Sequence, residues 1–304
     1  MVILDMGLFS YEPPCVSGGS HAISSGQIHS SAGRDEGSGS GAAGGGCELA
    51  ALSPMRVYSA LPPALAERAR VWRASLRLKD GWSQRERGFF DAPGAAHARL
   101  VPGGPPLDAP VPVTVVFTAV EGARALLRAR PAAAVDAAVK LLRAVMLAAL
   151  DAVPGGGYVC REQEGALRYM LAFAGPAPAA QWCLVVQEAL MYAPWPPALL
   201  ALPEMAQARA PGSGALLFRG PRLKMGLCDG LPRSISPCYL GRCDLHGSNV
   251  NQAARFADVA AQGGQVACDV QLAEALFRWV SLCVCVCACV CVCVRACVCV
   301  CVCV

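Results

Sequence analysis

The alternation of apolar strand patterns with Ala/Leu-rich helix patterns between residues 111 and 268 most constrains how this chain can fold. Its first segment, Val113–Phe117, is apolar and β-branched, which is typical of a buried strand. A helix or pair of helices is expected over residues 123–152, and the glycines at 155–157 end it. The pattern therefore predicts that a compact α+β domain begins near residue 111.

The rest of the domain follows as a hairpin, a helix, a strand, a further helix and a further strand. These elements are predicted at residues 158–163 with 166–173, 177–192, 223–227, 248–261 and 265–268. The order is β-α-β-β-α-β with one helix and one strand appended. It predicts a ferredoxin-like domain, in which helices cover an antiparallel sheet.

The segments outside this domain have a different composition. We expect residues 1–55 to be a disordered Ser/Gly/Ala-rich segment and 56–110 to be a helical lead-in with a Pro/Gly linker. The domain is placed at 111–281, and a Cys-Val repeat fills 282–304. The period of two in that repeat and the charge of Arg295 do not suit a membrane helix. Alternating Cys and Val codons are what a TG dinucleotide repeat encodes, so we interpret the tail as low complexity.

Charge and cysteine content narrow the functional classes. The net charge of +4 is spread without basic runs, which argues against nucleic-acid binding. Ten of the 18 cysteines lie in the tail, and the others are scattered without the spacing of a zinc site. No signal-peptide pattern opens the chain. We expect an intracellular, cytoplasmic domain, with any membrane anchor in a larger signalling protein of which this is a part.

Two short segments indicate chemistry on a phosphate. Asn251 and Arg255 lie four residues apart on a predicted helix, so both project from the same face. An amide and a forked guanidinium in this arrangement suit a reaction that builds charge on a phosphate. Far upstream, the strand in Phe117–Gly122 ends in an acidic-glycine turn where a magnesium-dependent enzyme would place a carboxylate. Ala119 occupies that position.

Four pieces in order resemble the catalytic domain of class III nucleotide cyclases, the adenylate and guanylate cyclases. VTVVFTAVEG at 113–122 is similar to the family's opening strand, F-T-D-I-x-G, and GGYVCREQEGALRYMLAF at 156–173 to its central hairpin. LKMGLCDG at 223–230 resembles R-x-G-[LI]-H-x-G. GSNVNQAARFADVAAQGGQV at 247–266 resembles V-N-x-A-A-R followed by G-Q-[IV]. The family's usual closing hairpin is missing before the repeat, so we expect a sheet with an open edge.

The resemblance implies a reaction and an assembly. In that family two domains pair head to tail, and each active site lies between them. Two aspartates of one domain hold Mg²⁺ or Mn²⁺ on the triphosphate, and the ribose 3′-oxygen attacks the α-phosphate. The other domain supplies a Lys with an Asp/Thr or Glu/Cys pair for the base, and an Asn and an Arg for the ribose and the transition state. ATP or GTP is the implied substrate, and the base is left open.

Carried onto this chain, the family's residues match unevenly. Asn251 and Arg255 match the Asn and Arg, whereas both metal aspartates are replaced, by Ala119 and Ala166. Alanine cannot bind a hard cation. The lysine position falls on Glu162 with Arg161 beside it, and Ser248 falls near the second base-reading position. The hairpin holds one extra residue, so this register could shift by one.

Four hypotheses follow. The first is a domain that keeps the Asn/Arg half, is inactive as a homodimer, and acts as half of a heterodimeric site with metal supplied by its partner. The second is an active cyclase that uses Glu121 and Glu164, each two residues from a missing aspartate and about 7 Å along the strand. The third is a non-catalytic interaction or dimerisation module in a signalling protein. The fourth is a truncated product without a stable fold.

Overall fold

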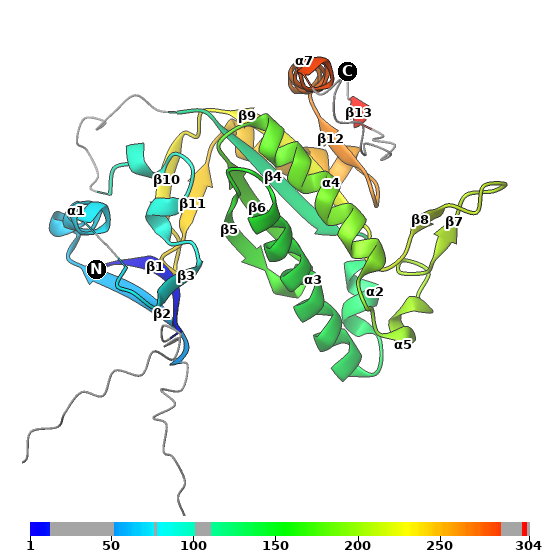
Figure 1. The fold of residues 1–304 in the computed structure, drawn as a ribbon, viewed down its shortest axis with the longest axis horizontal. Helices are drawn as coiled ribbons and strands as arrows, with labels where there is room; N and C mark the ends of the chain where they lie inside the picture. Colours follow the sequence, from blue (N-terminus) through cyan, green and yellow to red (C-terminus); the bar gives the residue numbers. More distant parts are fainter. Residues whose placement is uncertain (13–51, 76–77, 101–110, 287–299, 303–304) are drawn as a thin grey trace, which may run out of the picture.

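The structure is a computed structural model that describes residues 1–12, 52–75, 78–100, 111–286 and 300–302. A six-stranded sheet forms its centre, with the strand order β13-β12-β9-β4-β6-β5 (Figure 1). The strands of this sheet are β4 (Val113–Val120), β5 (Tyr158–Gln163), β6 (Arg168–Phe173), β9 (Leu223–Gly230), β12 (Val266–Cys268) and β13 (Val300–Val302).

The predicted ferredoxin-like core is confirmed. Its helices are α2 (Ala123–Arg128), α3 (Ala132–Ala152) and α4 (Pro176–Tyr192). Each neighbouring pair among strands β9, β4, β6 and β5 is antiparallel, and their order is that of a split β-α-β arrangement. The appended strand β12 joins β9 in parallel, as the additional helix before it requires.

Helices α3 and α4 cover one face of the sheet (Figure 1). Alternate residues of the strands point to this face and form one apolar cluster with them, including Val116, Leu171 and Met225. Trp182 of α4 lies at its centre, fully buried, with its indole N–H donating to the carbonyl of Met146 at 3.2 Å. Side chains on one face recur at every second residue of a strand and about every 3.6 residues of a helix. The apolar faces of the strands and of the two helices therefore pack into one core.

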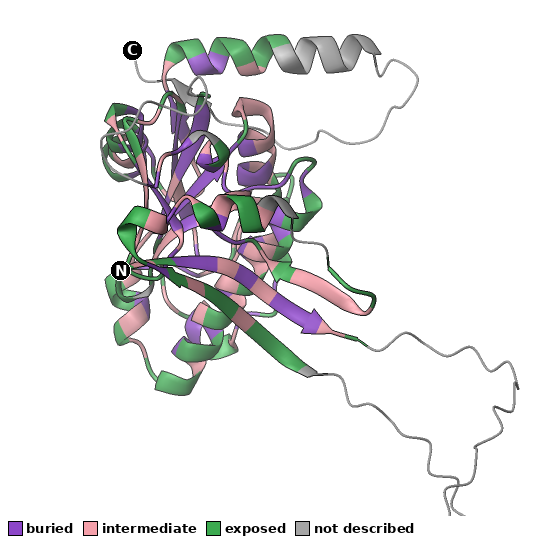
Figure 2. Ribbon diagram, turned by 90° about the vertical axis from the view of Figure 1, so that its left-hand side faces the viewer, coloured by how far each residue is buried: buried purple, intermediate pink, exposed green. Residues whose placement is uncertain are grey.

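A second layer covers the other face, and it comes from the N-terminal part of the chain. Strands β1 (Val2–Tyr11), β2 (Leu52–Leu61) and β3 (Trp82–Glu86) form a sheet in the order β2-β1-β3, and helix α1 (Arg68–Ser75) follows β2. Leu4, Phe89 and Ala69 of this layer share a buried cluster with Val115 of β4 and Met170 of β6. Figure 2 shows β1 largely buried and β2 facing solvent.

This layer corrects two expectations. Residues 1–55 were expected to be disordered, but residues 2–11 and 52–55 belong to paired strands; residues 13–51 lie outside the described part. The 56–110 segment was expected to be helical, but it holds most of β2 and all of β3 besides α1. The physical reason is that this sheet depends on long-range contacts. β1 buries part of its side chains against the folded domain, and its strand partner β2 lies far away in the sequence.

The connecting regions also hold more regular structure than predicted. The elements there are α5 (Pro197–Leu200), the short hairpin β7 (Ala208–Arg209) with β8 (Leu216–Phe218), and the hairpin β10 (Ser234–Pro237) with β11 (Cys243–His246). The β5–β6 turn differs as well, because Glu164–Ala166 form a 3₁₀ turn and Leu167 has a positive φ of 48° with a fully buried side chain. Burial of that leucine offsets the backbone strain.

After β12 the chain forms helix α7 (Val270–Val286), so the helix extends into the segment assigned to the Cys-Val repeat. Residues 287–299 of the repeat lie outside the described part. Among the helices that the structure describes, none has the length and apolar character needed to cross a bilayer.

Candidate functional site

Helix α6 (Ser248–Arg255) carries the two residues predicted to act on a phosphate. Its buried side packs on the sheet through Val250 and Ala253. Gly226 of β9 permits this contact, because a Cβ there would lie 2.1 Å from the carbonyl oxygen of Ala253. Asn251 and Arg255 are exposed on the outer side of the helix. The sheet therefore holds α6 in place while both polar side chains face outward.

The two positions at which the resemblance places metal ligands lie in a cavity of about 780 Å³ at one end of β4. Ala119 and Ala166 both line it, so the structure brings together the two positions that the resemblance paired. Neither Asn251 nor Arg255 is among its lining residues. The pair Asn251 and Arg255 on α6 therefore lies apart from the cavity that Ala119 and Ala166 line.

Glu121, one of the two carboxylates considered as substitutes, lines that cavity and already has partners within the chain. Glu121 accepts a hydrogen bond from the backbone N–H of Gly263 at 3.2 Å and lies 3.8 Å from a guanidinium nitrogen of Arg222. The side chain of Glu164 lies outside the described part of the chain. No group of three or more His, Cys, Asp or Glu side chains suited to a metal occurs among the residues that the structure describes.

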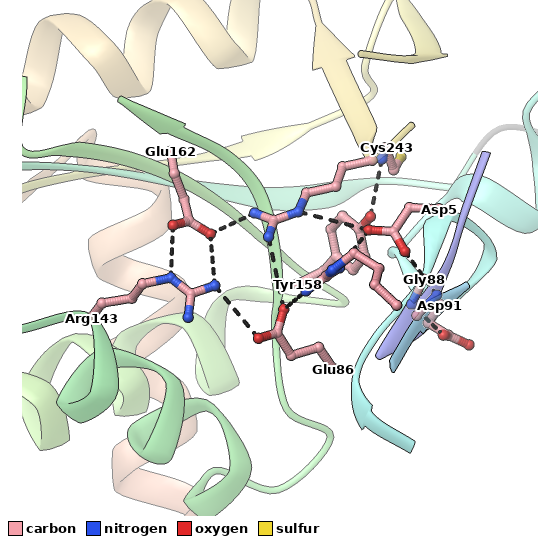
Figure 3. A network of polar contacts seen from close by, with 11 residues as sticks. Asp5, Glu86, Gly88, Asp91, Arg143, Tyr158, Glu162 and Cys243 are labelled. Carbon is pink, nitrogen blue, oxygen red and sulfur yellow. Dashed lines mark hydrogen bonds and ion pairs between the residues drawn. The ribbon is translucent and has the colours of Figure 1, made fainter. Parts of the chain in front are cut away.

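Glu162, predicted to bind nucleotide, lies in an ion-pair network between the two layers (Figure 3). Arg143 of α3 donates to its carboxylate at 2.9 Å, and Arg242 does so at 2.5 Å. Burial would raise the pKa of Glu162, but the hydrogen bonds from the two arginines outweigh it and the pKa is lowered. Both carboxylate oxygens are already engaged within the chain.

The network continues into the N-terminal sheet. Arg242 approaches Glu86 of β3 and Asp5 of β1 at 3.8 and 4.0 Å, and Arg56 of β2 pairs with both of those carboxylates. Asp5 is almost fully buried, at 1% exposure. These contacts fasten the N-terminal layer to the edge strand β5, and the apolar cluster beside them packs the same interface.

Arg161, the second predicted nucleotide-binding residue, pairs with a residue that the sequence reasoning missed. Its guanidinium lies 2.6 Å from a carboxylate oxygen of Asp244 on β11. The other oxygen of Asp244 is buried with no hydrogen-bond partner, and His246 lies 3.7 Å from the paired one. A buried acceptor without a partner beside a guanidinium forms a polar site that a ligand could complete.

Strand β11 links this pair to α6. It contacts β5 on one side and α6 on the other, and Ser248 stands exposed at the first position of α6. Arg161, Asp244 and the start of α6 therefore gather around β11. A β-bulge at Cys160, which interrupts the β5–β6 register between Val159 and Arg161, accompanies the extra residue noted in the hairpin.

Comparison with known proteins finds similar sequences but no matching family model. The chain is 34% identical over 111 residues to an adenylate cyclase of Mycosarcoma maydis, which covers 36% of the chain and 4% of that protein. It is 30% identical over 166 residues to an adenylate cyclase of Podospora anserina, covering 53% of the chain and 7% of that protein. The chain thus spans less than a tenth of the length of these relatives.

Comparison with solved structures also finds cyclase domains. A Trypanosoma brucei adenylate cyclase in its monomeric state aligns with a TM-score of 0.44 at 24% identity, covering 53% of this chain and 74% of that one. The monomeric guanylyl cyclase domain of a rhodopsin fusion protein from Blastocladiella emersonii aligns with a TM-score of 0.41 at 14% identity, covering 56% and 86%.

Proposed function

We propose that this chain, which contains a class III nucleotide cyclase domain, supplies Asn251 and Arg255 to an active site completed by a second cyclase domain. The observation that carries the proposal is the separation of the two groups of residues. Asn251 and Arg255 are exposed on α6, whereas alanines occupy both expected metal positions in the cavity. A homodimer of this chain would lack the carboxylates, so we expect it to be inactive by itself.

The proposed reaction is cyclisation of a nucleoside triphosphate. The ribose 3′-oxygen forms a bond to the α-phosphorus, the bond from that phosphorus to the β-phosphate oxygen breaks, and pyrophosphate leaves. The hydroxyl proton passes to solvent. Arg255 would donate forked hydrogen bonds to the oxygens on which charge builds, and Asn251 would hold the ribose. Mg²⁺ or Mn²⁺ bound to the partner's carboxylates would neutralise the triphosphate.

Arg161 and Asp244 are proposed to read the base. Adenine offers an acceptor at N1 and donors at N6, which match a guanidinium and a free carboxylate oxygen. The unpartnered oxygen of Asp244 supports this assignment, whereas Glu162 already has two arginine partners. We propose ATP as the nucleotide because the sequence relatives are named adenylate cyclases. Ser248, at the first position of α6, is proposed to contribute to the same base-binding site.

A second candidate function is a non-catalytic interaction module. The observation that favours it is the ion-pair network, because Glu162 serves to join two layers of the same chain. In this alternative the domain would bind a partner cyclase without completing its site.

Nucleotide-dependent association separates the two candidates. The full chain would be mixed with a cyclase domain that carries both aspartates, and the association constant measured by sedimentation with and without Mg²⁺ and a non-cyclisable ATP analogue. The shared-site proposal predicts tighter association with nucleotide and loss of that gain in Arg255→Ala. Equal association with and without nucleotide would favour the interaction module.

A further inference from the structure

Three consecutive residues before Asp244 are each held by a different part of the chain. Gly241 and Arg242 lie in the turn between β10 and β11, and Cys243 begins β11. Asp244, whose carboxylate is the proposed reader of the base, follows directly. A hydrogen bond forms only when its donor and acceptor heavy atoms lie within about 3.2 Å, so the contacts that fix these three residues also decide what Asp244 can reach.

Gly241 rests on the backbone of the N-terminal layer. Its carbonyl oxygen accepts a hydrogen bond from the N–H of Asp5 on β1 at 2.9 Å. Its φ is 75°, and a Cβ at this position would lie 2.6 Å from the backbone nitrogen of Asp5. Both the left-handed backbone and the close approach require glycine. The turn is therefore held against β1 without an intervening side chain.

Arg242 holds the carboxylate that lies beside Arg161 in the sequence. Its guanidinium lies 2.5 Å from a carboxylate oxygen of Glu162 on β5 and 3.8 Å from one of Glu86 on β3. Arg161, which directly precedes Glu162, pairs with Asp244 at 2.6 Å. Because Glu162 is engaged in this way, it does not compete with Asp244 for Arg161.

Cys243 is tied to β5 through its backbone. Its N–H donates to the hydroxyl oxygen of Tyr158 at 3.0 Å (Figure 3). Tyr158 is 2% exposed, and burial raises the pKa of its hydroxyl, so the group stays neutral and available as an acceptor. A buried backbone N–H that loses its partner is costly, so removal of this oxygen should let β11 shift.

We propose that Tyr158, Gly241 and Arg242 are positioning residues that set the selectivity of this chain for the base. They act through Asp244 and do not need to touch the nucleotide themselves. The inference rests on the proposed function, in which Asp244 reads the base.

The N-terminal layer supplies two of the anchors. Asp5 on β1 holds Gly241, and Glu86 on β3 lies near Arg242. Both carboxylates lie outside residues 113–266, the part of the chain that resembles cyclases. Selectivity for the base therefore depends on a layer that the family motifs do not include.

A shift of Asp244 should affect one group of the base. Adenine would present the donors of its amino group to the free carboxylate oxygen of Asp244. A shift of about 1 Å would lengthen that hydrogen bond beyond its useful range, whereas the contacts to ribose and phosphates are proposed to come from α6 and the partner domain. A nucleotide without the amino group should therefore bind equally well to wild type and to the positioning variants. A merely structural defect would weaken the binding of both nucleotides.

Equilibrium binding of two nucleotides tests the proposal. The full chain would be mixed, in Mg²⁺, with a cyclase domain that has both metal aspartates but has lost its own Asn and Arg. The mixture is titrated with 3′-deoxy-ATP or with the 3′-deoxy triphosphate of purine riboside, which lacks only the amino group; neither nucleotide can cyclise. We expect wild type to prefer 3′-deoxy-ATP by about tenfold, the contribution of one hydrogen bond to a charged group. In Tyr158→Phe, Arg242→Met and Gly241→Ala this preference should fall by about threefold or more, with unchanged affinity for the second nucleotide.

Arg56→Met is the matched control. Arg56 of β2 pairs with the same two N-terminal carboxylates that Arg242 approaches, but among the described residues it has no ion pair with the β10–β11 hairpin. This variant disturbs the same network without touching the turn, so it should keep the wild-type preference. Circular dichroism shows which variants are folded. Tyr158→Phe removes a single oxygen and keeps the test decisive if Gly241→Ala does not fold.

Asp244→Ala separates this inference from the role on which it rests. If Asp244→Ala keeps the preference, or if neither nucleotide binds to wild type, Asp244 does not read the base and both proposals are overturned. If Asp244→Ala loses the preference while folded Tyr158→Phe and Arg242→Met retain it, only the positioning inference is overturned. The same holds if Arg56→Met loses the preference as fully as Arg242→Met.

Discussion

The ion-pair network gives a prediction whose size can be worked from the structure. Asp5, Glu86 and Glu162 face Arg56, Arg143 and Arg242, so three negative charges balance three positive ones. Glu162→Gln removes one charge and leaves Arg143 and Arg242 short of a partner at a site that is 11% exposed. Breaking a buried pair costs about 3–5 kcal/mol.

The expected loss here is smaller, about 2–3 kcal/mol, because Glu86 remains within 3.6 Å of Arg143 and 3.8 Å of Arg242. Urea unfolding of the full chain at neutral pH measures it. Adding Arg242→Met to the Glu162→Gln variant restores the charge balance. The double variant should therefore lose about 1 kcal/mol less unfolding free energy than the sum of the two single losses. Additive losses, or a Glu162→Gln loss below about 0.5 kcal/mol, would refute the reasoning.

Three further predictions concern the same regions. The pKa of Glu162 is lowered in the folded chain, so its contribution to the free energy of unfolding is complete above the ordinary pKa of 4.5 and is lost as pH falls through the folded pKa. The difference in stability between wild type and Glu162→Gln should therefore shrink near pH 3. An equal difference at pH 3 and at pH 7 would contradict this. Gly226→Ala should cost at least about 2 kcal/mol because its Cβ would strike the backbone of α6, whereas Gly165→Ala, with open space around it, should be nearly neutral in the same unfolding assay. Burial raises the pKa of the Cys160 and Cys243 thiols, so alkylation at pH 8 followed by mass spectrometry should label the partly exposed Cys238 before these two, and equal labelling of the three would count against the packing.

Much of the cyclase-like fold is readable from the sequence because its strands and helices carry strong local patterns. Val113–Phe117 is apolar throughout and lies in β4, and three glycines follow α3 as expected. The N-terminal layer was missed for a physical reason. β1 pairs with residues 52–61 across a Ser/Gly-rich segment, and its burial depends on a surface that only the folded domain provides.

The candidate site, like the fold, could be predicted from the sequence only where the signal is local. Four-residue spacing on one helix predicted that Asn251 and Arg255 share a face, and both are exposed on α6. The pairing of Arg161 with Asp244 joins residues 83 positions apart, and nothing local in the sequence marks it. The pairing of Ala119 with Arg168 on β6 and Lys224 on β9 likewise depends on register across three strands, which composition and motif spacing do not specify.

Cyclic AMP formation in a complementation assay tests the central claim most directly. The full chain would be mixed with a cyclase domain that has both metal aspartates but has lost its own Asn and Arg, with ATP and Mg²⁺ or Mn²⁺. We predict activity in the mixture only, reduced at least a hundredfold, by about 2.7 kcal/mol or more, in Arg255→Ala. The control Arg278→Ala, an exposed arginine on α7, should leave it unchanged. Activity of the chain by itself, or a silent mixture of folded and associated proteins, would contradict the account.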